Sequence, residues 1–216
     1  MKIKICGLCR EEDIDYVNEA LPDYAGFVFA ESRRQLSYAA AELLRSKLSD
    51  DIIPVGVFYD APIAEISSMY KGGIINIAQL HGNEDVNYIK ELKDSCDIPI
   101  IKAIVLENEE EIISDGIEKN SSAHSNLFFN SLSVFNTEYL LVDSGRGSGK
   151  SFNWAMLDKI NFPSPWFLAG GINIENIKNA MSYKPYGIDV SGGAETDGFK
   201  DREKILQLTM MARKEN

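Results

Sequence analysis

Eight short apolar runs recur along the 216-residue chain, and most of them lead into a stretch with helical periodicity. The runs are rich in Ile, Val and Phe and lack apolar/polar alternation, which is typical of strands covered on both faces. We expect strands at Ile3–Cys6, Ala25–Phe29, Ile53–Phe58, Ile75–Leu80, Ile100–Ile104, Tyr139–Val142, Trp166–Ala169 and Gly187–Val190. Strands that alternate with helices indicate parallel pairing and right-handed crossovers.

Amphipathic segments lie between these runs and predict helices. We expect helices at Glu11–Ala20, Tyr38–Leu48, Pro62–Tyr70, Glu84–Lys93 and Arg202–Ala212. Asp60 is a possible cap for the helix that begins near Pro62, and Asn173 is a candidate N-cap for a further helix. Ser121–Asn136 is rich in Ser and Asn and fits an irregular helical region or a long loop.

The repeat favours a (β/α)₈ TIM barrel as a single domain over residues 1–216, although such barrels usually run to ~250 residues. An open, doubly wound sheet is the alternative, and periodicity does not separate the two. In a barrel, all strands end on one face, so residues far apart in sequence surround one pocket.

Net charge limits the partners of the chain. At −11, it argues against a nucleic-acid partner and against an anionic membrane surface. Helix N-termini and a few Arg or Lys can still hold a small anionic substrate. No apolar stretch approaches the ~20 residues of a membrane helix, and the first residues do not fit a signal peptide. Three cysteines without a framework indicate free thiols in a reducing compartment, so we expect a cytoplasmic protein.

Two of the predicted strands end in reactive side chains. Cys6 and Asp143 are a candidate base and acid for moving protons on a small molecule. A catalytic Cys6 needs nearby positive charge or backbone dipoles to favour its thiolate. Cys6 and Cys9 also form a Cys-x-x-Cys, typical of a redox pair or half of a zinc site. Zinc lacks further ligands at suitable spacing here, and two buried small residues remain the simpler interpretation.

Two pairs of glycines follow the last two predicted strands. Barrels typically hold phosphate at these loops, because backbone N–H groups approach an anion closely where no side chain intervenes. The candidate phosphate-binding residues are Gly170, Gly171, Ser191, Gly192 and Gly193. Tight turns alone are the alternative.

A further Gly-rich segment, Gly145–Ser151, resembles a nucleotide-binding P-loop. The motif needs a Gly six positions before Lys150, where this chain has Ser144. A nucleotide-binding protein, a flexible loop and a lid over an anionic substrate therefore all remain open.

Two polar groups follow other predicted strands. Arg34, in Ser32–Gln35, has the planar fork that binds a carboxylate in bidentate fashion, although a surface Arg pair is usually a solvated loop. His81 ends the fourth run and fits either a proton shuttle or a packed polar residue.

Taken in order, these segments resemble the phosphoribosylanthranilate isomerase family. The resemblance runs from residue 2 to about residue 201, whereas residues 107–137 match little. Arg146, Asn153 and Gly192 depart from the family pattern. The matching segments are Lys4–Leu8, Gly26–Phe29, Ser32–Arg34, Val55–Phe58, Gln79–Gly82, Ile101–Ala103, Leu141–Ser144, Gly147–Trp154, Leu168–Gly171 and Asp189–Glu195.

The resemblance implies a (β/α)₈ enzyme of tryptophan biosynthesis that converts N-(5-phosphoribosyl)anthranilate to its 1-deoxyribulose 5-phosphate isomer. It implies that Cys6 is the general base, Asp143 the general acid and Arg34 the partner of the anthranilate carboxylate. It assigns phosphate to the two glycine loops, and we expect His81 and Asp189 to bind substrate as well. The substrate supplies its own electron sink, so no metal or organic cofactor is expected. A monomer or a homodimer is expected. A different sugar-phosphate isomerase or synthase is the alternative.

Overall fold

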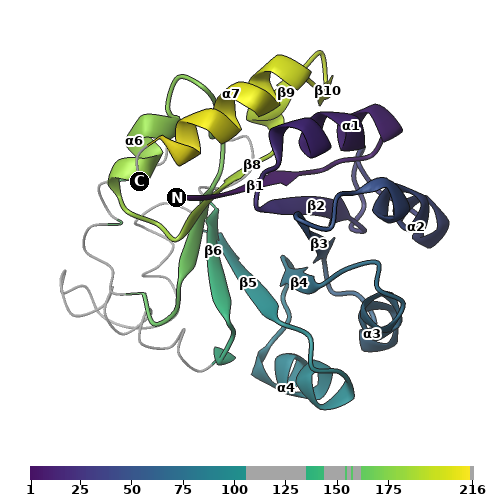
Figure 1. Ribbon diagram of the computed structural model, residues 1–216. Helices are drawn as coiled ribbons and strands as arrows, with labels where there is room; N and C mark the ends of the chain where they lie inside the picture. The colour runs from purple at the N-terminus through teal and green to yellow at the C-terminus, as the bar shows by residue number, and fades with distance from the viewer. Residues whose placement is uncertain (106–134, 144–153, 155–156, 158–161, 215–216) are drawn as a thin grey trace, which may run out of the picture.

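The computed structural model of the protein describes residues 1–105, 135–143, 154, 157 and 162–214 (Figure 1). Eight parallel strands close into a barrel in sequence order. They are β1 (Lys2–Cys6), β2 (Tyr24–Val28), β3 (Ile53–Phe58), β4 (Ile77–Leu80), β5 (Ile100–Val105), β6 (Tyr139–Asp143), β7 (Trp166–Ala169) and β8 (Gly187–Val190). Since β8 pairs in parallel with β1, the predicted barrel is confirmed and the doubly wound sheet is excluded.

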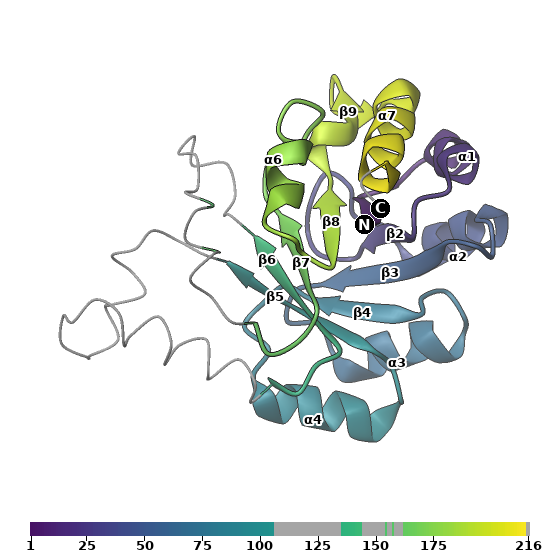
Figure 2. The same cartoon turned by 60° about the vertical axis from the view of Figure 1, so that its left-hand side comes forward.

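Helices lie around the outside of the barrel (Figures 1 and 2). They are α1 (Glu11–Ala20), α2 (Tyr38–Lys47), α3 (Ile63–Lys71), α4 (Val86–Ser95), α6 (Ile177–Ser182) and α7 (Arg202–Arg213). Polar caps start three of them: Ser37, Asp85 and Asp201 each accept a hydrogen bond from a backbone N–H of the first turn. None of these described helices has the length and apolar character to cross a membrane.

Three predicted helix starts differ from the structure. Asp60 does not cap α3, whose N-cap is Pro62, because the Asp60 carboxylate accepts hydrogen bonds from Asn83 in the loop after β4. Glu84 precedes α4, which begins at Val86 after Asp85. For α6 the N-cap is Asn176.

The side chain of Asn173 nevertheless accepts the backbone N–H groups of Glu175 and Asn176, and so shapes the turn before α6. Most of the Ser121–Asn136 segment, up to residue 134, lies outside the described residues, as do Gly145–Ser151 and Asn153.

Side chains on the strands alternate between the barrel interior and the outer core under the helices. Ile3 and Ile5 of β1 belong to the outer core, which leaves Lys4 and Cys6 on the inner face. Aromatic rings fill the interior near the amino-terminal ends of the strands, from Tyr24, Tyr139, Phe167 and Tyr186. The apolar floor of the barrel therefore lies below the strand ends that carry Cys6 and Asp143.

A short hairpin follows β8 and a 3-10 turn at Gly192–Ala194. Its strands, β9 (Glu195–Thr196) and β10 (Phe199–Lys200), pair with Glu195 opposite Lys200. Asp197 and Gly198 make the turn with positive φ values of 51° and 84°, a geometry that Asp and Gly tolerate. The hairpin brings a carboxylate and an ammonium side by side next to α1 and the end of β8.

Candidate active site

The two predicted proton-transfer residues end strands on the same rim of the barrel. Cys6 is the last residue of β1, and Asp143 is the last residue of β6. Asp143 lies two residues beyond Leu141, which packs in the inner cluster, so Asp143 shares the inner face of its strand. Only β7 and β8 separate the two strands on one side of the closed barrel. The fold thus brings both residues, 137 positions apart, to one inner rim.

The Cys6 thiol occupies space left by a glycine. Gly26 lies opposite Cys6 in the β1–β2 register, and a Cβ on Gly26 would lie only 2.7 Å from the Cys6 sulfur. Burial raises the pKa of the thiol most; Lys4 and Lys200 lower it, Asp189 raises it, and the net pKa is above the ordinary value. Positive charges are therefore present, as expected for a thiolate, but their effect on the pKa is smaller than that of burial.

Lys4 and Asp189 form a buried ion pair beside Cys6. The Lys4 Nζ lies 2.9 Å from Asp189 Oδ1, and the side chains are 0% and 8% exposed. Burial lowers the pKa of Lys4, but the charges of Asp189 and Cys6 raise it, with a net rise, so Lys4 remains an ammonium. Asp189, predicted to bind substrate, thus directs one oxygen to Lys4.

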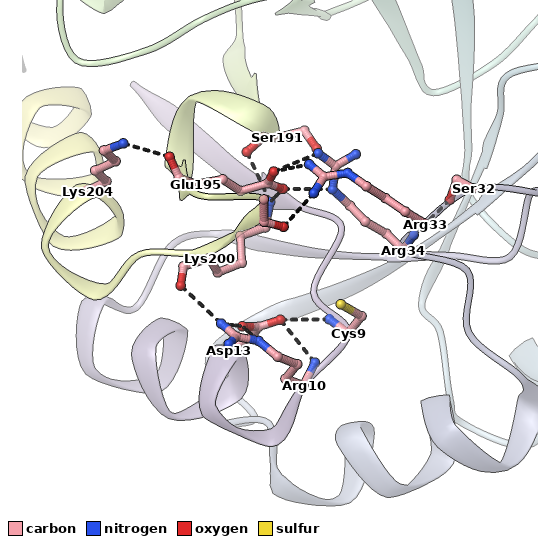
Figure 3. Close-up of polar contacts among 11 residues, drawn as sticks. Cys9, Arg10, Asp13, Ser32, Arg33, Arg34, Ser191, Glu195, Lys200 and Lys204 are labelled. Atoms are coloured by element: carbon pink, nitrogen blue, oxygen red, sulfur yellow. Dashed lines mark hydrogen bonds and ion pairs between the residues drawn. The ribbon is translucent and has the colours of Figure 1, made fainter.

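The Glu195 carboxylate pairs with three cationic side chains, two from the loop after β2 and one from the hairpin after β8 (Figure 3). Arg34 donates from Nε and Nη2 to its two oxygens at 2.7 and 2.9 Å, and Lys200 Nζ lies at 2.8 Å. Arg33 pairs with the same carboxylate. Burial raises the pKa of Glu195, but hydrogen bonds from Arg34 and Lys200 lower it to about 2. With three cations for one carboxylate, the cluster keeps an excess of positive charge.

Arg34 lies across the backbone that follows Cys6. A Cβ on Gly7, whose φ is +81°, would lie 2.4 Å from Arg34 Cδ and 3.4 Å from Ser191 Oγ. Only a glycine leaves room for the arginine there. The loops after β1, β2 and β8 therefore converge next to Cys6, with the guanidinium on top.

The two glycine loops after β7 and β8 touch. A Cβ on Gly193 would lie 1.9 Å from the Ile172 carbonyl oxygen, so the backbones of the two loops pack directly against each other. At Gly171 (φ +65°) and Gly192, in contrast, a Cβ would meet no described atom within 4 Å. Two of the predicted phosphate-binding glycines, Gly171 and Gly192, thus have bare backbone next to open space, on loops that pack against each other at Gly193.

On the other side of the rim, His81 follows β4 and lies near Asp143. The His81 Nε2 is 3.5 Å from Asp143 Oδ2, and both side chains are partly exposed. The predicted acid and the imidazole of His81 are therefore neighbours on the rim.

A further buried carboxylate, Glu84, lies in the loop after β4, three residues beyond His81. It accepts the backbone N–H groups of Asp60 and Gly82, each at 2.9 Å, and pairs with Lys102 Nζ at 2.7 Å. Both charged side chains are almost fully buried. This cluster ties the loops after β3 and β4 to β5.

Sequence reasoning assigned no role to Lys4, Glu84, Lys102, Glu195 or Lys200. A signal existed for Lys4 and for Lys102, because a lysine inside an apolar strand covered on both faces requires a buried counter-charge. For Lys4, the natural partner was Asp189, inside another apolar strand. Glu195 and Lys200 lie in a polar segment, where charged residues are usually solvated, and carry no such signal.

The Cys-x-x-Cys segment was also considered as a redox pair or as half of a zinc site. All three cysteines are free thiols, with Cys6 buried and Cys9 partly exposed. Among the described residues no group of three or more His, Cys, Asp or Glu side chains could hold a metal ion.

A cavity of about 530 Å³ lies at the opposite, amino-terminal end of the barrel, lined by Met1, Lys2, Asp23, Tyr186 and Arg213.

A closed barrel with polar groups gathered at the carboxyl ends of its strands defines the class of (β/α)₈-barrel enzymes. Residues 3–210 match the profile of the family described as N-(5'phosphoribosyl)anthranilate (PRA) isomerase. The chain is 41% identical over 213 residues to the N-(5'-phosphoribosyl)anthranilate isomerase of Endomicrobium trichonymphae, covering 98% of each chain. The chain belongs to this family.

Solved structures agree with this assignment. The phosphoribosyl anthranilate isomerase of Thermus thermophilus superposes with a TM-score of 0.78 at 28% identity, covering 97% of each chain. A second isomerase superposes with a TM-score of 0.76 at 26% identity, covering 99% of this chain and 98% of that one. It was solved in complex with reduced 1-(o-carboxyphenylamino)-1-deoxyribulose 5-phosphate. The predicted activity, isomerisation of phosphoribosylanthranilate in tryptophan biosynthesis, is confirmed by the family.

Proposed function

We propose that Cys6 and Asp143 are the general base and general acid of the isomerase reaction. The observation that carries this assignment is their shared position, because each ends a strand of one closed barrel on the inner face of the same rim. The reaction needs two proton transfers at different atoms of one sugar, and two groups on one rim can reach both.

The first transfer opens the ribose ring. Asp143 gives its proton to the ring oxygen, the bond from that oxygen to C1′ breaks, and the anthranilate nitrogen forms a Schiff base with C1′. The positive nitrogen withdraws electrons from C2′. The Cys6 thiolate then removes the C2′ proton, which leaves an enol. The enol hydroxyl loses its proton and C1′ gains one, which gives the ketose. The proton that Cys6 took from C2′ replaces the one that Asp143 gave to the ring oxygen, so exchange through solvent returns both groups to their starting forms.

Two anchors would fix the sugar between acid and base. Arg34 has Nε and Nη2 on Glu195, which leaves Nη1 to meet the anthranilate carboxylate. Gly170, Gly171, Ser191, Gly192 and Gly193 would hold the phosphate through the bare backbone of the touching loops. His81, whose Nε2 lies 3.5 Å from Asp143 Oδ2, would contact the substrate beside the proposed acid.

The experiment is a fluorescence assay of anthranilate-ribotide consumption by Cys6→Ser and Asp143→Asn. Each substitution should lower kcat by at least about 100-fold while circular dichroism shows an intact barrel. Cys9→Ser is the matched control and should stay near the wild-type rate, because Cys9 takes no part in the mechanism. A near-wild-type rate in either variant would remove that residue from its role.

We also propose that residues 1–216 form one domain that acts in the cytoplasm as a monomer or a homodimer. The free thiols of Cys6, Cys9 and Cys96 suit a reducing compartment. A small-molecule substrate that carries its own electron sink requires no cofactor.

A further inference from the structure

Lys4 is a buried cation that the reaction scheme above does not use. It lies on the inner face of β1, two residues before Cys6 and opposite Asp189 in the β1–β8 register. Its side chain is fully buried, with Nζ 2.9 Å from Asp189 Oδ1. Burying an ion pair costs several kcal/mol in desolvation, and an apolar pair of the same volume is often at least as stable. The charge of Lys4 is therefore not explained by stability alone.

Within the part of the chain that the structure describes, the charged groups that face Cys6 come from four elements. They are Lys4 on β1, Asp189 on β8, Lys200 on β10 and Arg34 in the loop after β2. The charges of Lys200 and Arg34 are shared with Glu195, which lies between them (Figure 3). Lys4 is different, because it lies on the same face of β1 as Cys6, two residues before it, and its positive charge lowers the pKa of the thiol.

We propose that Lys4, anchored by Asp189, is a positioning residue that holds a permanent positive charge beside the Cys6 sulfur and so stabilises its thiolate. The inference rests on the proposed role of Cys6 as general base. Lys4 itself neither gains nor loses a proton. It lowers the free energy of the anionic sulfur in a buried site where an uncompensated thiolate would be costly.

The two charges of the Lys4–Asp189 pair can be removed one at a time, and the two removals should affect Cys6 in opposite directions. Lys4→Gln removes the positive charge next to the sulfur, whereas Asp189→Asn removes the negative charge and leaves Lys4 uncompensated. The first change should make the Cys6 thiolate harder to form, and the second should make it easier. Damage to packing alone would have no reason to act in opposite directions.

The measurement is the rate of Cys6 alkylation by iodoacetamide from neutral to alkaline pH, in a Cys9→Ser background. Peptide mass spectrometry separates Cys6 from Cys96, which serves as the internal control. Lys4→Gln should move the midpoint of the rate-against-pH curve up by at least about one pH unit, which makes alkylation about tenfold slower below the midpoint. Asp189→Asn should move the midpoint down by a similar amount. Lys4→Arg keeps the positive charge, so its midpoint should lie close to that of the wild type. In the same proteins, the pH at which kcat/KM rises as Cys6 ionises should shift in the same direction as the alkylation midpoint.

Unchanged midpoints, or shifts of both variants in one direction, would overturn the inference. Should Lys4→Gln fail to fold, the double variant Lys4→Met with Asp189→Asn replaces it, and its midpoint must lie above that of Asp189→Asn alone. The two proposals fail separately. If Cys6→Ser keeps its activity, the general-base role is wrong whatever the alkylation shows; if Cys6→Ser is inactive and the midpoints do not move, only the role of Lys4 is wrong.

Discussion

Two of the buried carboxylates that brace the rim of this barrel, Glu84 and Glu195, are neutralised in different ways. Glu84 binds two backbone N–H groups and one cation, Lys102, and both charged side chains are almost fully buried. Glu195 binds three cations, of which Arg34 is 22% exposed and Arg33 53% exposed. One cluster is balanced and closed, whereas the other is cationic and open.

The difference separates a brace from a binding surface. At Glu84 the single positive charge is matched inside the protein, so little is left to attract a ligand. At Glu195 two positive charges remain in excess, and the partly exposed guanidinium of Arg34 lies over Gly7, next to Cys6. An acidic protein with a net charge of −11 can bind an anionic substrate through such a local positive field.

The largest expected effect breaks the closed cluster. Glu84→Gln leaves Lys102 buried without a counter-charge, and removing one partner of a buried pair typically costs about 3–5 kcal/mol of unfolding free energy. Urea unfolding measures that loss. Because the cluster has no excess cation, KM of the folded variant should stay within about twofold of the wild-type value.

Asp50→Asn is the matched control, since it breaks the ion pair of an almost fully exposed carboxylate with Arg45. It should cost less than about 1 kcal/mol. Equal losses from the two substitutions would show that burial of the Glu84 pair does not matter for stability.

Glu195→Gln should show the opposite division between stability and binding. Arg34 loses the bidentate partner that orients its guanidinium, and a hydrogen bond to a charged group is worth about 1.5–3 kcal/mol, so KM should rise by about tenfold or more. The loss of unfolding free energy should be smaller than in Glu84→Gln, because two of the three cations reach water. Steady-state kinetics with kcat and KM separated checks the prediction. An unchanged KM with a large loss of stability would make Glu195 a brace like Glu84.

The strands of this fold follow from the sequence because each apolar run is local. Each of the eight predicted runs overlaps an observed strand, and β3, β7 and β8 match their predicted bounds. The helix start at Glu84 was predicted wrongly for a physical reason. A glutamate before an amphipathic segment suits a first helical turn, yet this one turns inward to meet Lys102, 18 positions later.

The candidate site, like the fold, was predicted from the sequence only in part. Cys6 and Asp143 were visible as polar ends of apolar strands, and the barrel places them on one rim. The positive cluster was not visible, because Arg34 meets Glu195 across 161 positions through a hairpin that has no helical or strand periodicity. Contacts between loops depend on how the barrel closes, and a single sequence does not encode that closure locally.

The smallest predicted effect concerns acid, and it sharpens the contrast at Glu195. Its pKa lies near 2 in the folded protein, below the 4.5 of an unperturbed glutamate. A depressed pKa contributes stability that is fully present above about pH 4.5 and is lost as pH falls from there toward 2. The difference in unfolding free energy between wild type and Glu195→Gln should therefore be constant near neutral pH and shrink steadily between pH 4.5 and 2. Urea unfolding of the two proteins at a series of pH values measures this difference, from which the titration of all other carboxyls cancels. A difference that stays constant to the acid limit would mean that Glu195 is not held as a carboxylate by Arg34 and Lys200, and the open cluster would lose its basis.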